Sequence, residues 1–416
     1  MQLGLIRLLR EYSPSSDLTV MAAIGSNQSE VLESELDETS LEDVKLLGGL
    51  RPTTINFGSF ALRFHLIRKV YTAVFFILGV LKWPILFLAA KSRIFAKTLS
   101  KADRAGLEAL TNADLVVWNG RNFRSDSKNR ELYEFWPLLY VPLLAVLLGK
   151  KIACIGASIW PVKTKLASKF LKFVLDRTIF LSVREEESFR ISKNLLGPET
   201  LVVLLPDLSL AYLRSLATTP AGKQIIKKWP EKVGVTLVDW KNNGNIAQEN
   251  YVKTLTLFCN WLLENGTISI KIIPQVTFHA EDSLAIAHRI RSNSPKAIEI
   301  VSDSLTVSDL VIRYTQLDVL IATRMHSAIF AVSQGTPTVL IPYDSGGKWA
   351  ILKYLGVINP GLSHSDLDFD KLKKLFLQTW EDRGEFANRV GPALDKAYAN
   401  VGDNLKIPLR IAGLLA

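Results

Sequence analysis

Arg324 and His326, separated by one residue, follow an apolar run from Leu317 to Ala322 that is typical of a buried strand. A helix is expected to begin here, with Thr323 as its N-cap residue. Ligands of parallel α/β sheets bind at the carboxyl ends of the strands, and a helix N-terminus attracts anions. The pattern predicts that Arg324 binds a phosphate or carboxylate and that His326 donates or accepts a proton. An ordinary ion pair beside a structural histidine is the alternative.

A second apolar strand follows this segment and ends at Tyr343. The loop after it, Asp344 to Lys348, has the sequence DSGGK and adds another cation. We expect Lys348 to reach the same site as Arg324, and we include Tyr343 among the substrate-binding residues.

Polar residues also follow the predicted strands of the first half of the chain. Arg184 is a second strand-end cation, in the sequence SVREEES. It either pairs at the surface with the glutamates that follow it or clamps a dianion together with Arg324. The loops Asn119-Gly120 and Gly156-Ala157-Ser158 are expected to present backbone N–H groups to a ligand. Asp207 follows another strand and would act as a base, a sugar-hydroxyl acceptor or a helix cap.

The remaining polar residues give weaker signals. Gln275 follows a predicted strand of the second half and is assigned to hydroxyl binding, with an ordinary polar loop as the alternative. The five histidines are scattered and no H-E-x-x-H or paired-cysteine pattern occurs, so we expect no metal. Neither a Walker loop nor G-x-G-x-x-G is present, and no cofactor is expected. Cys154 and Cys259 lie in apolar runs and are predicted core residues.

Composition indicates a globular protein, since 48% of the 416 residues are hydrophobic and 22% are charged. The net charge of +10 is concentrated between residues 61 and 105, where nine basic residues accompany one acid. This local basicity differs from the basic face of a nucleic-acid-binding domain, and no such motif accompanies it. We therefore expect no nucleic-acid partner.

The centre of this basic segment, Val70 to Ala90, is apolar apart from Lys82. Its 21 residues are long enough to span a bilayer, although Lys82 and Pro84 interrupt it. Three interpretations stay open: a true span, an in-plane helix pair on an anionic membrane, or a helix pair buried in the domain or in an oligomer. The expected location is cytoplasmic, at the inner face of the membrane.

Strand and helix patterns alternate along most of the chain, which predicts an α/β fold of two doubly wound Rossmann-like domains facing across a cleft. The predicted boundaries are 1–211 for the N-terminal domain with its insertion at 61–105, 212–231 for a linker, and 232–416 for the C-terminal domain with a helical tail. Because a helix at Gln2–Tyr12 comes before the strand at Leu18–Ala23, the N-terminal domain is expected to lack its first strand. The acidic residues 30–43 are predicted to form a solvated loop or exposed helix.

Seven segments, taken in order, resemble the polysaccharide pyruvyl transferase family: ADLVVWNG, KKIACIGASIWP, LSVREEES, PDLSL, KIIPQ, DVLIATRMHSAIFAVSQGTPTVLIPYDSGGK and KYLG. The resemblance runs from Asp114 to Gly356. Family members usually open with a strand and an N-x-G-D-type loop, and many carry Gly-Gly where this chain has Asn119-Gly120.

The resemblance implies a glycosyltransferase-B-like fold and a pyruvyl transferase. Such an enzyme transfers a pyruvyl group from phosphoenolpyruvate to two hydroxyls of a sugar, forming a cyclic ketal and releasing phosphate. It implies that Arg184 and Arg324 are the cations for phosphoenolpyruvate and that His326 is the motif histidine. The expected partners are phosphoenolpyruvate and a sugar or lipid-linked glycan acceptor. Two alternatives remain: a sugar-nucleotide-dependent glycosyltransferase of the same fold, and a non-catalytic membrane-associated scaffold in polysaccharide assembly.

Overall fold

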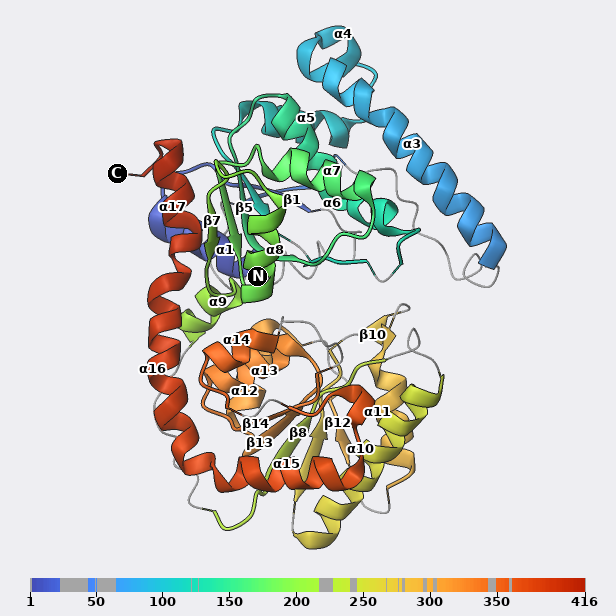
Figure 1. Cartoon of the computed structure of the whole chain (residues 1–416), viewed down its shortest axis with the longest axis vertical. Helices are drawn as coiled ribbons and strands as arrows, with labels where there is room; N and C mark the ends of the chain where they lie inside the picture. The colour runs from blue at the N-terminus through green and yellow to red at the C-terminus, as the bar shows by residue number, and fades with distance from the viewer. Residues whose placement is uncertain are drawn as a thin grey trace. The chain divides into compact units, whose positions relative to one another are not determined.

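The chain folds into two compact α/β units (Figure 1). Unit 1 comprises Met1–Leu208 and Val401–Ala416, and unit 2 comprises Ser209–Asn400. The computed structural model describes residues 2–22, 44–48, 50, 65–120, 122–125, 127–216, 227–239, 245–266, 268–275, 277–278, 281–294, 298–301, 305–342, 349–358 and 361–415. The predicted acidic loop at 30–43 lies outside these residues.

Unit 1 is built around a parallel sheet. Its strands are β1 Thr19–Ala22, β2 Lys45–Gly48, β3 Val116–Asn119, β4 Asn122–Phe123, β5 Ile152–Ile159, β6 Phe180–Val183 and β7 Val202–Leu204. Its helices are α1 Gln2–Tyr12, α3 His65–Lys91, α4 Arg93–Ala96, α5 Lys101–Asn112, α6 Glu131–Leu147, α7 Lys165–Leu175, α8 Glu186–Leu195 and α17 Asp403–Ala412. The strand order is β3-β5-β6-β7, with β4 paired to β5, while β1 and β2 form a separate parallel pair.

Strand β5 is longer than its sequence predicts. Gly156, Ala157 and Ser158 were expected in a loop, but all three belong to this strand. Its pairing with β6 is irregular between Cys154 and Ala157, and Gly156 has a φ of 65°. Glycine tolerates this left-handed conformation, so the strand continues through a bulge instead of ending. The prediction of a loop was wrong, although Ser158 still lies near the carboxyl end of β5.

The last helix, α17, belongs to unit 1, whereas the sequence predicts it as the tail of the second domain. Side chains alternate across a strand, and Leu181 and Val183 of β6 pack into the main core of the unit. Ser182 therefore points to the opposite face, where its hydroxyl bonds to the buried Asn404 side chain of α17. The Asn404 amide also donates to the Pro206 carbonyl at 3.1 Å, so α17 is fixed to the end of this sheet by polar contacts.

Unit 2 repeats the alternation of strand and helix. Its strands are β8 Lys232–Val235, β9 Ser269–Ile272, β10 Thr277–Phe278, β11 Glu281–Asp282, β12 Glu299–Ile300, β13 Val319–Ala322 and β14 Thr338–Leu340. Its helical segments are α9 Ser209–Leu216, α10 Asn245–Asn265, α11 Ser283–Ser292, α12 Val307–Thr315, α13 Met325–Ser333, α14 Ala350–Tyr354, η4 His364–Asp366, α15 Phe369–Glu381 and α16 Arg383–Val401. Residues 212–216, predicted as the start of a linker, belong to α9.

The main sheet of unit 2 has the strand order β12-β9-β8-β13-β14, and all its neighbours are parallel. In chain order this is 3-2-1-4-5, the order of a doubly wound nucleotide-binding sheet. The order reverses between β8 and β13. Loops leaving these two strands diverge to opposite faces of the sheet, and ligands of such folds bind in the crevice left at that point.

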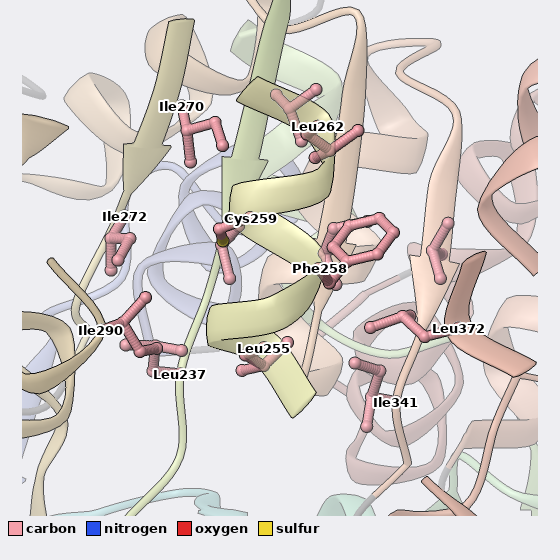
Figure 2. Close-up of a cluster of buried hydrophobic side chains, with 14 of the residues drawn as sticks. Leu237, Leu255, Phe258, Cys259, Leu262, Ile270, Ile272, Ile290, Ile341 and Leu372 are labelled. Carbon is pink, nitrogen blue, oxygen red and sulfur yellow. The ribbon is translucent and has the colours of Figure 1, made fainter. Parts of the chain in front are cut away.

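The core of unit 2 forms where α10 packs on the sheet (Figure 2). Leu255, Phe258, Cys259 and Leu262 of α10 lie against strand residues such as Ile272, and all are buried. The spacing of these α10 residues matches one face of a helix. The prediction that both cysteines are core residues is confirmed, because Cys154 is buried as well. Burial raises the pKa of the Cys259 thiol to about 12, so it stays protonated.

The apolar segment at 70–90 lies within one continuous helix, α3, which includes Pro84. One side of this helix packs on unit 1, where Leu86 and Ala89 are buried. Within the part of the chain that the structure describes, no helix is both long and apolar enough to cross a membrane.

Asp318, just before β13, joins this strand to β8 through its carboxylate. It accepts hydrogen bonds from the backbone N–H groups of Glu231 and Lys232 at 2.9 and 3.0 Å and from Lys227 Nζ at 3.2 Å. Burial alone would raise its pKa, but these donors lower the pKa below its usual value.

We expect Asp318→Asn to lower the stability of unit 2 at neutral pH by roughly 1–3 kcal/mol, because it removes a charge that three donors surround. A carboxyl with a lowered folded pKa stabilises the protein above its unfolded pKa of about 3.9, and this contribution is lost as pH falls through the folded pKa. Denaturant titrations should therefore show the deficit at pH 7 and its disappearance in acid. A pH-independent deficit would contradict this explanation, and the exposed Glu264→Gln is the control.

Candidate functional site

A threonine directly follows each of the two strands at the reversal point of unit 2, and these two residues, Thr236 and Thr323, hydrogen-bond to each other. The Thr323 hydroxyl donates to the Thr236 carbonyl at 2.6 Å, and the Thr236 hydroxyl accepts from the Thr323 N–H at 3.2 Å. Because its hydroxyl is used in this way, Thr323 is not the cap of the next helix. Arg324 occupies the N-cap position of α13, with a φ of −121°. The predicted cap was therefore wrong by one residue.

Arg324 is anchored to the strand across the reversal point. Its Nε donates to the Leu237 carbonyl at 3.0 Å, and its Nη2 lies 3.4 Å from the Ser283 hydroxyl. Ser283 begins α11 and itself donates to the Leu237 carbonyl at 3.2 Å. A backbone oxygen and a buried hydroxyl thus orient the guanidinium at the carboxyl edge of the sheet.

His326 lies in the first turn of α13 and is half-buried. Its ring meets the Phe330 ring edge-on, with centroids 6.5 Å apart, and this contact limits how far the imidazole can turn. The positive end of the helix dipole lies in the same turn. Arg324 and His326 are therefore brought together at one helix N-terminus, as the sequence predicts.

Gln275 belongs to the same edge of unit 2 because it contacts a tyrosine near Arg324. Its amide Nε2 donates to the Tyr314 hydroxyl at 2.6 Å. Burial is the largest influence on the pKa of Tyr314 and raises it to about 12, while the charge of Arg324 acts in the opposite direction. Tyr314 is thus a neutral phenol at the end of α12. Sequence reasoning missed it, since its position in the helical pattern indicates only a core residue.

Unit 1 brings together three of the predicted residues at the carboxyl edge of its sheet: Ser158, Arg184 and Asp207. Arg184 Nε donates to Ser158 Oγ at 2.8 Å, and Nη1 donates to Asp207 Oδ2 at 2.8 Å. Glu185, one of the glutamates that follow Arg184 in the sequence, accepts from Arg184 Nε at 3.0 Å and from Ser158 Oγ at 2.5 Å. We call these four residues the Arg184 cluster.

The Arg184 cluster is buried and contains two carboxylates for one guanidinium. The Arg184 side chain is 9% exposed, and both carboxylates are buried more deeply. Burial would lower the pKa of Arg184, but Asp207 and Glu185 raise it above its ordinary value, so this side chain stays charged. The alternative that Arg184 pairs with a following glutamate is confirmed for Glu185, but the pair is buried and not at the surface. These hydrogen bonds and ion pairs hold the Arg184 side chain in one orientation.

Asn119 is the last residue of β3, beside Ile155 of β5, and Gly120 follows it directly. The Gly120 N–H donates to the Ile155 carbonyl at 2.6 Å. The Asn119 Oδ1 atom is buried, and it has no hydrogen-bond partner among the residues that the structure describes. An unsatisfied buried acceptor costs free energy, so this atom is suited to receive a donor group of a ligand.

Gly120 is expected to tolerate no side chain. A Cβ atom there would lie 2.6–2.8 Å from the Cβ, Cα and N atoms of Ala157, closer than real contacts allow. Gly120→Ala should destabilise unit 1 by about 1–3 kcal/mol through overpacking. Gly391→Ala is the control, because open space surrounds Gly391 in helix α16 and alanine favours helices by up to about 1 kcal/mol. Thermal unfolding of both variants checks the prediction, and equal melting temperatures would contradict it.

Two predicted residues, Tyr343 and Lys348, lie outside the described residues. Among the described residues, no group of three or more His, Cys, Asp or Glu side chains is arranged to hold a metal ion.

Comparison with known sequences gives a family. A family model described as polysaccharide pyruvyl transferase matches residues 34–345. A curated relative, the amylovoran biosynthesis protein AmsJ of Erwinia amylovora, is 23% identical over 264 residues. The matched region covers 60% of this chain and 61% of that relative.

Comparison with solved structures gives the fold. HepE of Anabaena in complex with UDP is 12% identical, with a TM-score of 0.51 over 99% of this chain and 94% of that one. A glycosyltransferase of Rickettsia africae is 13% identical, with a TM-score of 0.52 over 99% and 94%. A UDP-GlcNAc 2-epimerase of Neisseria meningitidis is 14% identical, with a TM-score of 0.53 over 98% and 95%. At these identities the likeness shows the fold alone, and it confirms the predicted glycosyltransferase-B-like class.

Proposed function

Because this chain belongs to the polysaccharide pyruvyl transferase family, we propose that it transfers a pyruvyl group from phosphoenolpyruvate to two hydroxyls of a sugar. The acceptor is a polysaccharide or its lipid-linked precursor. The name of the relative AmsJ, an amylovoran biosynthesis protein, supports a role in exopolysaccharide assembly.

The proposed reaction joins both sugar oxygens to C2 of phosphoenolpyruvate. The methylene carbon gains a proton and becomes a methyl group while the first hydroxyl adds to C2 and loses its proton. The bond between C2 and the phosphate oxygen then breaks, and the second hydroxyl adds to C2. Its proton leaves with the phosphate, so one ketal and one phosphate form from each donor molecule.

The observation that carries this proposal is the placement of Arg324 and His326 at the N-terminus of α13, over the reversal point of the sheet in unit 2. Phosphoenolpyruvate carries a phosphate and a carboxylate, and an oriented guanidinium suits either group. The helix N-terminus adds N–H groups for the same anion. His326, two residues after Arg324, supplies the proton for the methylene carbon or accepts one from the attacking hydroxyl.

The family resemblance also implies a second cation for phosphoenolpyruvate, Arg184 of unit 1. Two carboxylates and a hydroxyl fix the direction of the Arg184 guanidinium. Arg184 keeps its assignment to phosphoenolpyruvate from the family resemblance, with a guanidinium that is oriented before the donor binds. Asn119, Gly120, Ser158, Asp207 and Gln275 are assigned to substrate positioning, and Tyr343 and Lys348 keep the same assignment from their sequence alone.

Ligand titration separates this proposal from a sugar-nucleotide glycosyltransferase of the same fold. A ligand that binds only the folded protein raises its melting temperature, and the rise grows with the logarithm of the ligand concentration above its Kd. Phosphoenolpyruvate alone should therefore stabilise the protein, and nucleotide sugars should not. The reverse pattern would favour the glycosyltransferase, and stabilisation by neither donor would favour the non-catalytic scaffold.

Arg324→Lys should raise the KM for phosphoenolpyruvate roughly ten- to a hundredfold, the equivalent of one lost hydrogen bond between charged groups. A lysine keeps the positive charge but lacks the planar guanidinium. It therefore cannot donate to the Leu237 carbonyl and to the ligand at the same time. Arg289→Lys is the control, because Arg289 forms an exposed ion pair with Glu249 in the same unit. Initial rates over a range of donor concentrations give the result, and an unchanged KM would remove Arg324 from the donor site.

A further inference from the structure

Helix α3 presents a row of exposed apolar side chains to solvent. Ile77 is 55% exposed and Leu81 is 60% exposed, and Ile85 and Leu88 continue the row one turn at a time. The short helix α4 extends it with Ile94, which is 78% exposed. We call these five residues the apolar row. Four apolar side chains in register along one helix are a patch and not the scattered exposure of ordinary surfaces.

Two polar groups in the middle of α3, those of Lys82 and Trp83, are turned toward the protein instead of toward water. Lys82 Nζ pairs with Asp103 of α5 at 2.7 Å, and both side chains are largely buried. The Trp83 indole N–H donates to the Tyr140 carbonyl of α6 at 3.2 Å. A surface helix in water normally has the opposite arrangement, with its apolar face inward and its charges outward. The outer side of α3 therefore suits an apolar environment.

Basic residues cluster at the end of this row. Residues 77–105 contain six basic residues and one acid, a net charge of +5. The acid is Asp103, and Lys82 already neutralises it. Lys91, Lys97 and Lys101 are exposed. Arg104 donates to the carbonyls of Ala96, Lys97 and Leu99, so it holds α4 beside the start of α5.

We propose that the apolar row and its basic end bind the surface of an anionic phospholipid bilayer, with α3 lying in the plane of the headgroups. Apolar residues would enter the acyl boundary while the lysines contact lipid phosphates. A second copy of this chain fits poorly, because it would bring two copies of the same basic cluster together. This inference does not depend on the proposed pyruvyl transfer, although it would place the protein where lipid-linked glycans are found.

Sedimentation with vesicles tests the inference on the intact chain. Protein should bind vesicles of phosphatidylcholine mixed with phosphatidylglycerol, bind pure phosphatidylcholine weakly, and dissociate as salt is raised. Lys97→Gln and Lys101→Gln should each weaken binding about fivefold, the effect of one basic residue near the surface. Leu81→Asn should weaken it about tenfold or more through lost apolar contact. All three side chains are exposed, so circular dichroism should show unchanged folding.

Ile312→Asn is the matched control, because Ile312 is 56% exposed on α12 of unit 2 and should have no effect on vesicle binding. The inference fails if anionic vesicles bind no protein, or if the Leu81 and Ile312 variants bind equally well. It also fails if the protein is an oligomer that Leu81→Asn dissociates, since a second copy would then cover the row.

Discussion

A His326→Ala variant is expected to release phosphate from phosphoenolpyruvate, in the presence of its glycan acceptor, at about one-hundredth of the unmodified rate or less. General acid–base catalysis by a positioned side chain typically contributes about 10²–10⁴-fold. His326 is the residue of α13 assigned to proton transfer, and its ring is held by Phe330 at the first turn of the helix. Alanine removes the proton-transfer group but leaves the α13 backbone and Arg324 in place.

Comparing phosphoenolpyruvate binding with turnover in this variant distinguishes a catalytic role of His326 from a structural one. The variant should still be stabilised by phosphoenolpyruvate, because Arg324 remains anchored to the Leu237 carbonyl. His326→Gln should lose activity to a similar extent, since an amide is polar but does not exchange a proton at neutral pH. His288→Ala, an exposed histidine of α11, is the control. Undiminished phosphate release by the His326 variants would contradict the assigned role of His326 in proton transfer.

Arg184→Gln is expected to be the most destabilising single change in the Arg184 cluster. Breaking a buried ion pair by removing one partner costs about 3–5 kcal/mol, because the remaining charge stays buried without compensation. Here the loss of the guanidinium leaves two buried carboxylates, Glu185 and Asp207, close to the same place. Asp207→Asn leaves Arg184 and Glu185 as a balanced pair, so its cost should be smaller, about 1–3 kcal/mol.

The pH dependence of the stability lost in Arg184→Gln should show whether the two buried carboxylates cause that loss. Burial and the neighbouring like charge would raise the pKa of one carboxyl in the folded variant above its unfolded value. A group with a raised folded pKa contributes stability below the unfolded pKa and loses it as pH rises through the folded pKa. The stability deficit relative to the unmodified protein should therefore shrink from neutral pH toward about pH 4, where denaturant titration can measure it. A deficit that stays constant or grows in acid would point to lost packing instead.

The positions of the main site residues could be predicted from sequence because each follows a short apolar strand. Arg184, Asp207 and Arg324 all lie at strand ends, and the carboxyl ends of parallel strands within one unit meet at one edge. The local sequence pattern was sufficient to place these three residues at strand ends. It also identified the helix that begins after β13, with an error of one residue at the cap.

Contacts between distant segments could not be predicted. The sequence REEES offers three glutamates to Arg184, and only tertiary packing selects Glu185 and adds Asp207, 23 positions away. The bulge at Gly156 was missed because a glycine after an apolar run usually indicates a turn. The docking of α17 depends on Asn404 meeting Ser182, and no local pattern indicates such a pair.

Incubation of the unmodified protein with phosphoenolpyruvate labelled with ¹³C at its methylene carbon, and with a panel of exopolysaccharide repeating units, gives the most direct measurement. The proposed transfer predicts that the label appears by NMR as the methyl group of a glycan-bound ketal, with one phosphate released for each ketal. Unchanged phosphoenolpyruvate, together with transfer of a sugar from a nucleotide sugar to the same glycans, would contradict it.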